Sequence, residues 1–171
     1  MGKTPRALPR SAKRDIIVRK DGDEMSEYIC RAHSKSVLLY HYVCPAKYRR
    51  VIFNSKVDDI LIQTCKEITK RYDINILELG SDGNHVHFLI QSIPSISPSQ
   101  IAGIVKSITA KEIYRLYPEV NKKLWGGNIW SEGYFVATVG RHANEKQIEN
   151  YVRNQAKSYT KMYRGQLSFF D

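Results

Sequence analysis

Apolar and polar residues follow two different spacings along the chain, and each spacing predicts one kind of element. Residues 37–43 are rich in β-branched and aromatic side chains and are closed by Pro45, which predicts a strand. From Lys56 onward, apolar residues recur at steps of three and four over about 15 positions, which predicts a helix packed by one face.

The next two apolar segments lie on either side of a turn. Residues 74–79 alternate between apolar and polar positions, and residues 85–92 form a second strand-like stretch. Between them, residues 81–84 (Ser-Asp-Gly-Asn) are all typical of tight turns. The pattern predicts a hairpin.

The second half of the chain changes from helix to strand and back. Ser97 has the features of an N-cap, and helical spacing follows it over 98–117. A strand bracketed by glycines is predicted over 133–140, and a last helix over about 144–163.

The predicted order, β-α-β-β-α-β-α, indicates an α+β fold. Two right-handed βα crossovers joined through a hairpin give a ferredoxin-like sandwich, in which both crossover helices cover one face of an antiparallel sheet. The other face stays open for a ligand or for the additional C-terminal helix. The domain is expected over residues 36–164, with a flexible basic arm before it (1–35) and a short tail after it (165–171).

Charge narrows the choice of partner. The 171 residues contain 27 Lys and Arg against 17 Asp and Glu, a formal net charge of +10, which favours nucleic acid or an anionic membrane surface. No apolar run is long enough to span a bilayer and no secretory signal is visible, so a cytoplasmic protein is expected. The basic arm has two interpretations, phosphate contact or an extension that adds only solubility.

Residues 85–90 hold the most informative chemistry. In a strand, the apolar Val86, Phe88 and Ile90 share one face, which packs on the helices, so His85 and His87 point to the other face. Two imidazoles at i and i+2 suit a divalent metal ion. Two surface histidines without a role are the alternative. His41, elsewhere, is interpreted as a core or sheet-face histidine.

Tyr151 and Gln155 form a second candidate pair, because residues at i and i+4 share one helical face. The side-chain carbonyl of Gln can complete a site of two histidines for Mg²⁺ or Mn²⁺. An interfacial Tyr beside a solvent-facing Gln is the alternative.

Together these features resemble a known family. The chain carries His85-Val86-His87 on a strand and Tyr151-Val152-Arg153-Asn154-Gln155 on the last predicted helix. This combination resembles the single-tyrosine HUH transposases of small bacterial insertion sequences, the TnpA type, and the related REP-associated tyrosine transposases. Residues 40–50 and 130–136 are similar to the family's opening strand with its basic turn and to the strand before its catalytic helix.

The resemblance implies cleavage and rejoining of single-stranded DNA at hairpins near the ends of the element. Tyr151 would attack a phosphodiester and form a 5′-phosphotyrosine link. Mg²⁺ or Mn²⁺ on His85, His87 and Gln155 would polarise the phosphate. Because the covalent link conserves the bond energy, no ATP is needed, in agreement with the absence of a P-loop motif. The family works as a homodimer.

Basic residues cluster near the candidate tyrosine and after the first strand. They fit a surface that binds the DNA backbone, although a solvated face is the alternative for any one of them. The expected DNA-binding residues are Lys47, Arg49, Arg50, Arg141, Arg153 and Lys157.

The C-terminal tail carries a further short motif. Residues 166–170 (Gln-Leu-Ser-Phe-Phe) resemble the peptide by which bacterial replication proteins dock on the sliding clamp, and folding back onto the domain is the alternative.

The rival functions are a REP-associated transposase acting on dispersed palindromes and a non-catalytic ferredoxin-like module that binds nucleic acid.

Overall fold

The computed structural model describes residues 29–31, 34–36, 38–124, 127–139 and 158–162. Within these residues, five strands form one sheet in the order β6-β3-β5-β4-β7, and each neighbouring pair is antiparallel. The strands of this sheet are β3 (Leu38–Pro45), β4 (Ile74–Ser81), β5 (His85–Ser92), β6 (Phe135–Thr138) and β7 (Ser158–Lys161). A separate two-stranded sheet pairs β1 (Ile29–Arg31) with β2 (Ser34–Ser36).

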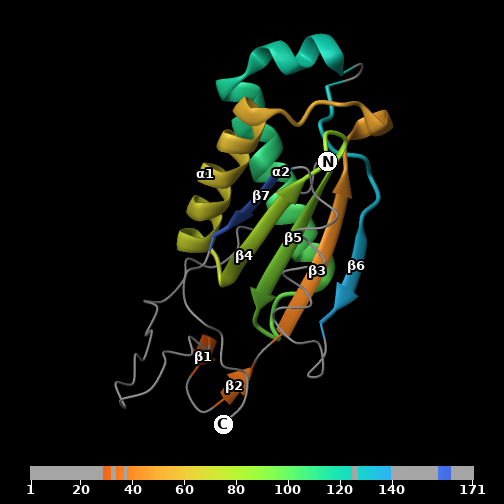
Figure 1. Ribbon diagram of the computed structural model, residues 1–171. Coiled ribbons are helices and arrows are strands. Elements are labelled where there is room, and N and C mark those ends of the chain that lie inside the picture. The colour runs from red at the N-terminus through yellow and green to blue at the C-terminus, as the bar shows by residue number, and fades with distance from the viewer. Residues whose placement is uncertain (1–28, 32–33, 37, 125–126, 140–157, 163–171) are drawn as a thin grey trace, which may run out of the picture.

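The predicted α+β, ferredoxin-like sandwich is confirmed. Two long helices, α1 (Ser55–Arg71) and α2 (Pro98–Leu116), cover the same face of the sheet (Figure 1). The strand β5 lies between β3 and β4 because each crossover helix carries the chain past one strand position, and the right-handed crossovers place β6 at the edge beside β3.

The helices begin where the sequence supplies cap residues. Asn54 Oδ1 accepts a hydrogen bond from Val57 N at 3.1 Å at the start of α1. At the start of α2, Ser97 and Gln100 form a reciprocal capping box, as the sequence predicts. These bonds satisfy backbone amides in the first turn of each helix, which favours a helix start at that point. The first residues of α1 and α2 lie within one position of the predicted ones.

Some elements have no counterpart among the sequence predictions. Two short 3₁₀ helices, η1 (Lys47–Arg49) and η2 (Pro118–Lys123), follow β3 and α2, and β1 and β2 precede the sheet. Each is at most six residues long, which is too short for a periodic pattern to show.

The predicted end of the last helix is wrong. Ser158–Lys161 is the strand β7, paired with Glu78–Ser81 of β4, whereas the prediction continued the helix to about Tyr163. The edge of β4 presents unpaired amide and carbonyl groups, and a segment containing Tyr159 and Thr160 suits a strand that satisfies them. Asp58 of α1 adds a side-chain hydrogen bond to Ser158. The rest of the predicted helix, residues 144–157, lies outside the described residues.

A buried segment after η2 holds the end of β3 in place. Ile129 and Trp130 are 1% and 6% exposed, and Lys47 N donates to the carbonyl of Ile129 at 2.7 Å. Trp130 Nε1 donates to Thr109 Oγ1 on α2 at 3.0 Å, and that hydroxyl donates in turn to a carbonyl of its own helix. The turn that follows β3 is therefore anchored through Trp130 to the core.

Replacing Thr109 by Val should lower the free energy of unfolding by about 1–3 kcal/mol, because the buried indole N–H of Trp130 loses its acceptor. Urea unfolding of both proteins measures the change. Thr64→Val is the matched control, since the hydroxyl of this buried helical threonine bonds only to the Ile60 carbonyl of its own helix among the described residues. Equal losses for the two variants would contradict the role assigned to the Trp130 bond.

Candidate metal and DNA-binding site

Strand β5 divides its side chains between two faces as predicted. Val86, Phe88 and Ile90 are at most 1% exposed and pack in the core beneath the helices. His85 and His87 lie on the opposite face of the sheet, with ring centroids 4.9 Å apart. On this face, which was expected to receive a ligand or the additional C-terminal helix, His87 is 2% exposed while the side chain of His85 is 18% exposed.

The ring of His85 is held by the turn that precedes it. Its Nδ1 lies 2.7 Å from Oδ1 of Asn84, and an amide oxygen only accepts hydrogen bonds. Nδ1 therefore carries the proton, and Nε2 presents a lone pair. A carboxylate oxygen of Asp82 lies 4.0 Å from this Nε2.

The ring of His87 is held by a third histidine, His41 of β3. His41 Nε2 and His87 Nδ1 are 3.1 Å apart, and the two rings are nearly parallel, with an interplanar angle of 7°. His87 Nε2 is buried and has no hydrogen-bond partner among the described residues. A buried polar atom of this kind costs free energy unless a ligand satisfies it.

Burial keeps these histidines neutral at neutral pH. Desolvation lowers the pKa of His87 to about 4, with smaller contributions from His41 and His85 nearby. Burial also lowers the pKa of His41. Neutral imidazole is the form that binds metal ions, so the lowered pKa of His87 fits a ligand of a divalent cation.

Two histidines do not complete a metal site. Among the described residues, no group of three or more His, Cys, Asp or Glu side chains could hold a metal ion. Gln155 and Tyr151 both lie outside the described residues, so their positions relative to the histidines stay predictions.

The basic turn after β3 is bonded directly to the turn that carries the histidines. Ala46 N donates to the Asn84 carbonyl at 2.8 Å, and the amides of Ile52 and Phe53 both donate to the Gly83 carbonyl, at 2.9 and 3.0 Å. Gly83 has a positive φ of 59°, and a Cβ at this position would lie 3.3 Å from Val51. The two turns therefore form one rigid unit.

Tyr48 and Arg49 lie in the middle of this basic turn with positive φ values of 55° and 53°. Two successive residues other than glycine in the left-handed region are unfavourable, and such conformations concentrate at functional sites. Tyr48 is 67% exposed, so its ring is available for stacking. The charge of the neighbouring Lys47 is partly balanced by Glu132, whose carboxylate is 3.5 Å from Nζ.

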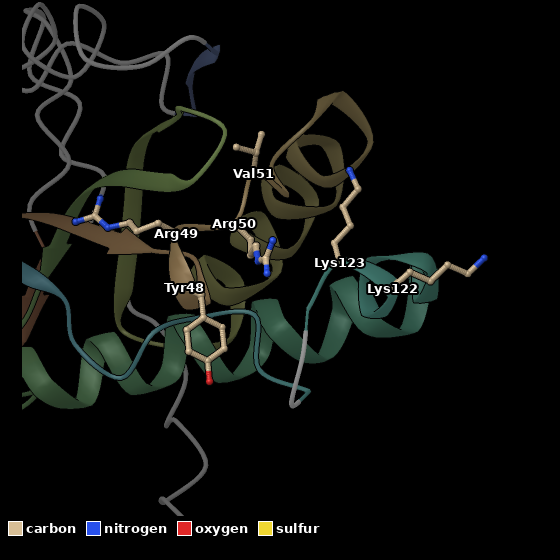
Figure 2. Close-up of a pocket in the computed structure, with 6 residues that line it drawn as sticks. All are labelled: Tyr48, Arg49, Arg50, Val51, Lys122 and Lys123. Carbon is tan, nitrogen blue, oxygen red and sulfur yellow. The ribbon is translucent and has the colours of Figure 1, made fainter.

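A surface hollow of about 640 Å³ lies beside the turn and carries four positive charges. Figure 2 shows Arg50 on the side of the turn that faces Lys122 and Lys123, and Arg49 extending away from these lysines. The residues that line this basic hollow are Tyr48, Arg49, Arg50, Val51, Lys122 and Lys123.

Two further lysines thus join the predicted basic cluster of the turn after β3, which contains Arg49 and Arg50. Lys122 and Lys123 lie at the end of η2. They were not among the DNA-binding residues predicted from the sequence, because a pair of lysines does not indicate which surface it lies on. Arg141, Arg153 and Lys157 lie outside the described residues. Among the described helices, none is long and apolar enough to cross a membrane.

Comparisons with known proteins identify relatives of this chain in sequence and in fold. The family model described as "Transposase IS200 like" matches residues 34–155. The ISDra2 transposase TnpA of Deinococcus radiodurans is 28% identical over 118 residues, which cover 69% of this chain and 84% of that protein. The transposase for insertion sequence element IS200 of Salmonella typhimurium is 28% identical over 134 residues, which cover 78% and 84%.

A solved structure shares the fold. The 1.90 Å crystal structure of a candidate transposase from Deinococcus radiodurans R1 superposes with a TM-score of 0.60 at 26% sequence identity. The match covers 74% of this chain and 97% of that chain.

Lowering the pH should destabilise the protein through His87. Its pKa is about 4 in the folded protein and 6.5 in an unfolded chain, so the unfolded state binds more protons between these values. The stability that His87 contributes by staying neutral in the folded state is present above pH 6.5. The free energy of unfolding should therefore fall by on the order of 2 kcal/mol between pH 7.5 and 5.

Urea unfolding in EDTA at the two pH values measures this loss, and His87→Gln is the comparison because Gln does not titrate. The variant should lose less stability over the same interval. If wild type and variant lose the same amount, the lowered pKa of His87 is contradicted.

Proposed function

This chain belongs to the IS200-like transposase family, and from that premise we propose that it cleaves and rejoins single-stranded DNA at insertion-sequence ends through Tyr151 and a divalent metal ion. The observation that carries the proposal is the paired histidine site. His87 presents a buried Nε2 without a partner among the described residues, and His85 presents a second Nε2 beside it.

The reaction would proceed by nucleophilic substitution at phosphorus. The hydroxyl oxygen of Tyr151 forms a bond to the phosphorus and loses its proton, and the bond from phosphorus to the 3′ oxygen breaks. The 3′ oxygen takes up a proton and leaves as a free hydroxyl, while the 5′ phosphate stays on Tyr151. A second 3′-hydroxyl reverses these steps on the new strand, so rejoining needs no nucleotide cofactor.

Mg²⁺ or Mn²⁺, when bound by His85, His87 and Gln155, supplies polarisation of the scissile phosphate. The protein's own part is to keep His87 neutral and to hold both rings in place. Burial does the first, as the lowered pKa of His87 indicates. Hydrogen bonds at the two Nδ1 atoms do the second.

The basic hollow would receive the DNA backbone beside this site. The hollow is lined by Arg50 of the basic turn and by Lys122 and Lys123 of η2, which lie far apart in sequence. The exposed ring of Tyr48 offers a stacking surface. Because hydrogen bonds tie the turn to Gly83 and Asn84, DNA held in the hollow would lie at a set position relative to His85. We propose a single-stranded DNA hairpin as the ligand.

The remaining partners are also proposals. With Tyr151 as the one proposed nucleophile of each chain, two strand exchanges would need two subunits, which favours a homodimer. The tail over residues 166–170 is proposed to dock on the bacterial sliding clamp, and the site of action is expected to be the cytoplasm. Residues 163–171 lie outside the described residues.

Tyr151→Phe should abolish covalent attachment to DNA. Wild-type protein is incubated with a hairpin oligonucleotide labelled at its 3′ end, because the fragment downstream of the cut stays on the tyrosine. A labelled adduct should appear on a denaturing gel with Mg²⁺ or Mn²⁺ and disappear with EDTA. Tyr159→Phe is the control, since Tyr159 lies on β7 and is not expected to react. An adduct that persists in Tyr151→Phe shows that another residue is the nucleophile.

Replacing Lys122 and Lys123 together by Gln should weaken hairpin binding roughly tenfold at moderate salt and lower the slope of log K against log salt concentration by about one to two. Fluorescence anisotropy over a salt series measures both quantities. The control replaces the exposed Lys66 and Lys111 on the outer helices, which removes the same charge elsewhere. Equal weakening in both double variants would show that only net charge matters, and that the basic hollow is not the binding surface.

A further inference from the structure

We propose that His41 and Asn84 are positioning residues that hold His87 and His85 with the proton on Nδ1, so that both Nε2 lone pairs are presented to one metal ion. Neither positioning residue is itself a ligand. The inference rests on the proposed function, because it concerns the same two histidines.

The contact from Asn84 sets the tautomer of His85. Oδ1 of Asn84 lies 2.7 Å from Nδ1, and this oxygen accepts the proton that Nδ1 carries. The backbone of Asn84 is held on both sides, since its carbonyl accepts from Ala46 N at 2.8 Å and its amide donates to the Asp82 carbonyl. The acceptor is therefore placed by the hairpin turn before any metal arrives.

The contact from His41 sets the tautomer of His87. Two arrangements fit a distance of 3.1 Å between His41 Nε2 and His87 Nδ1. If His41 donates, His87 Nε2 carries a proton in a buried position that has no acceptor among the described residues, and buried donors without partners are rare and costly. If His87 donates, Nε2 presents a lone pair instead, which a cation can satisfy.

The surroundings of His41 hold its ring where this bond requires it. His41 is 6% exposed and lies on β3, a central strand that is paired on both sides. The ring of Phe135 on β6 meets it edge-on, with centroids 6.5 Å apart. The near-parallel orientation of the His41 and His87 rings lets the bond lie close to both ring planes.

A hydrogen bond at the ring nitrogen that does not bind the metal is a general feature of metal-binding histidines. The nitrogen that does not bind the metal usually donates to a fixed acceptor, which orients the ring and raises its basicity. Here two different residues, from β3 and from the β4–β5 turn, supply one acceptor to each histidine. The site therefore requires little rearrangement on metal binding.

The test uses the full-length, metal-free protein at pH 7.5. Long-range ¹⁵N–¹H correlation spectra distinguish a protonated from an unprotonated ring nitrogen, and His85→Gln and His87→Gln samples assign the signals. Wild-type protein should show protonated Nδ1 and unprotonated Nε2 at both histidines. A protonated Nε2 on His87 or His85 overturns the inference without any positioning variant.

Variants then separate positioning from packing. His41→Leu removes the acceptor, so Mn²⁺ affinity, measured by electron paramagnetic resonance, should fall roughly 10–100-fold, and Nε2 of His87 should gain proton occupancy. His41→Gln is the matched variant, because its amide oxygen can reach the position of Nε2 and accept the same proton. It should restore most of the affinity. Asn84→Ala and Asn84→Asp form the corresponding pair for His85.

Three outcomes of this second stage contradict the proposal. They are Mn²⁺ affinity unchanged in His41→Leu, affinity no better in His41→Gln than in His41→Leu, and no Mn²⁺ binding by the wild type. The proposed nucleophile is judged separately, by the DNA adduct with Tyr151→Phe. A wrong nucleophile would leave the tautomers and the Mn²⁺ affinities as stated here.

Discussion

The pairing of β3 with β5 is the constraint on which the rest of the site depends. Eight residue pairs join these strands, from Leu38 opposite Ser92 to Pro45 opposite His85. This register places Val43 opposite His87, and His41 lies two pairs further along, opposite Leu89, so the two histidines are diagonal neighbours on one face. A slip of β5 by one residue would turn His85 and His87 toward the helices and move Val86 and Phe88 to the other face. Burial of the apolar face therefore also orients the imidazoles.

The same pairing brings the basic turn after β3 beside His85, one of the two proposed metal ligands. Because Pro45 ends β3 opposite His85, the chain leaves the sheet beside the hairpin turn that precedes β5. Hydrogen bonds to Gly83 and Asn84 then fix the basic turn, and the segment around Trp130 supports it from the other side. In the proposed reaction, one group of backbone hydrogen bonds would set both the DNA position and the metal position, which suits a reaction that depends on alignment of a phosphate with its nucleophile.

Burial of His87 serves the proposed chemistry at a cost in stability. A buried imidazole with one unpaired nitrogen is unfavourable in the metal-free protein, and the site persists because the surrounding sheet is held by a large core. The same burial lowers the pKa of His87 and keeps its lone pair available at neutral pH. A solvent-exposed histidine pair would lose metal to protons more readily as the pH falls.

Local chemistry accounts for most of what the sequence determined about this protein. The strands β3 to β6, the turn between β4 and β5, the Ser97 cap and the two faces of β5 are properties of neighbouring residues, and the sequence predicted each of them to within a few residues. Family membership also followed from short motifs. Tertiary structure alone decided that 158–161 is a strand, because its partner is the edge of β4. It alone brought His41 into contact with His87, and placed Arg50, Lys122 and Lys123 around one hollow, because these residues lie on segments distant in sequence. Pairing between distant segments is a property of the packed sheet, which no local pattern encodes.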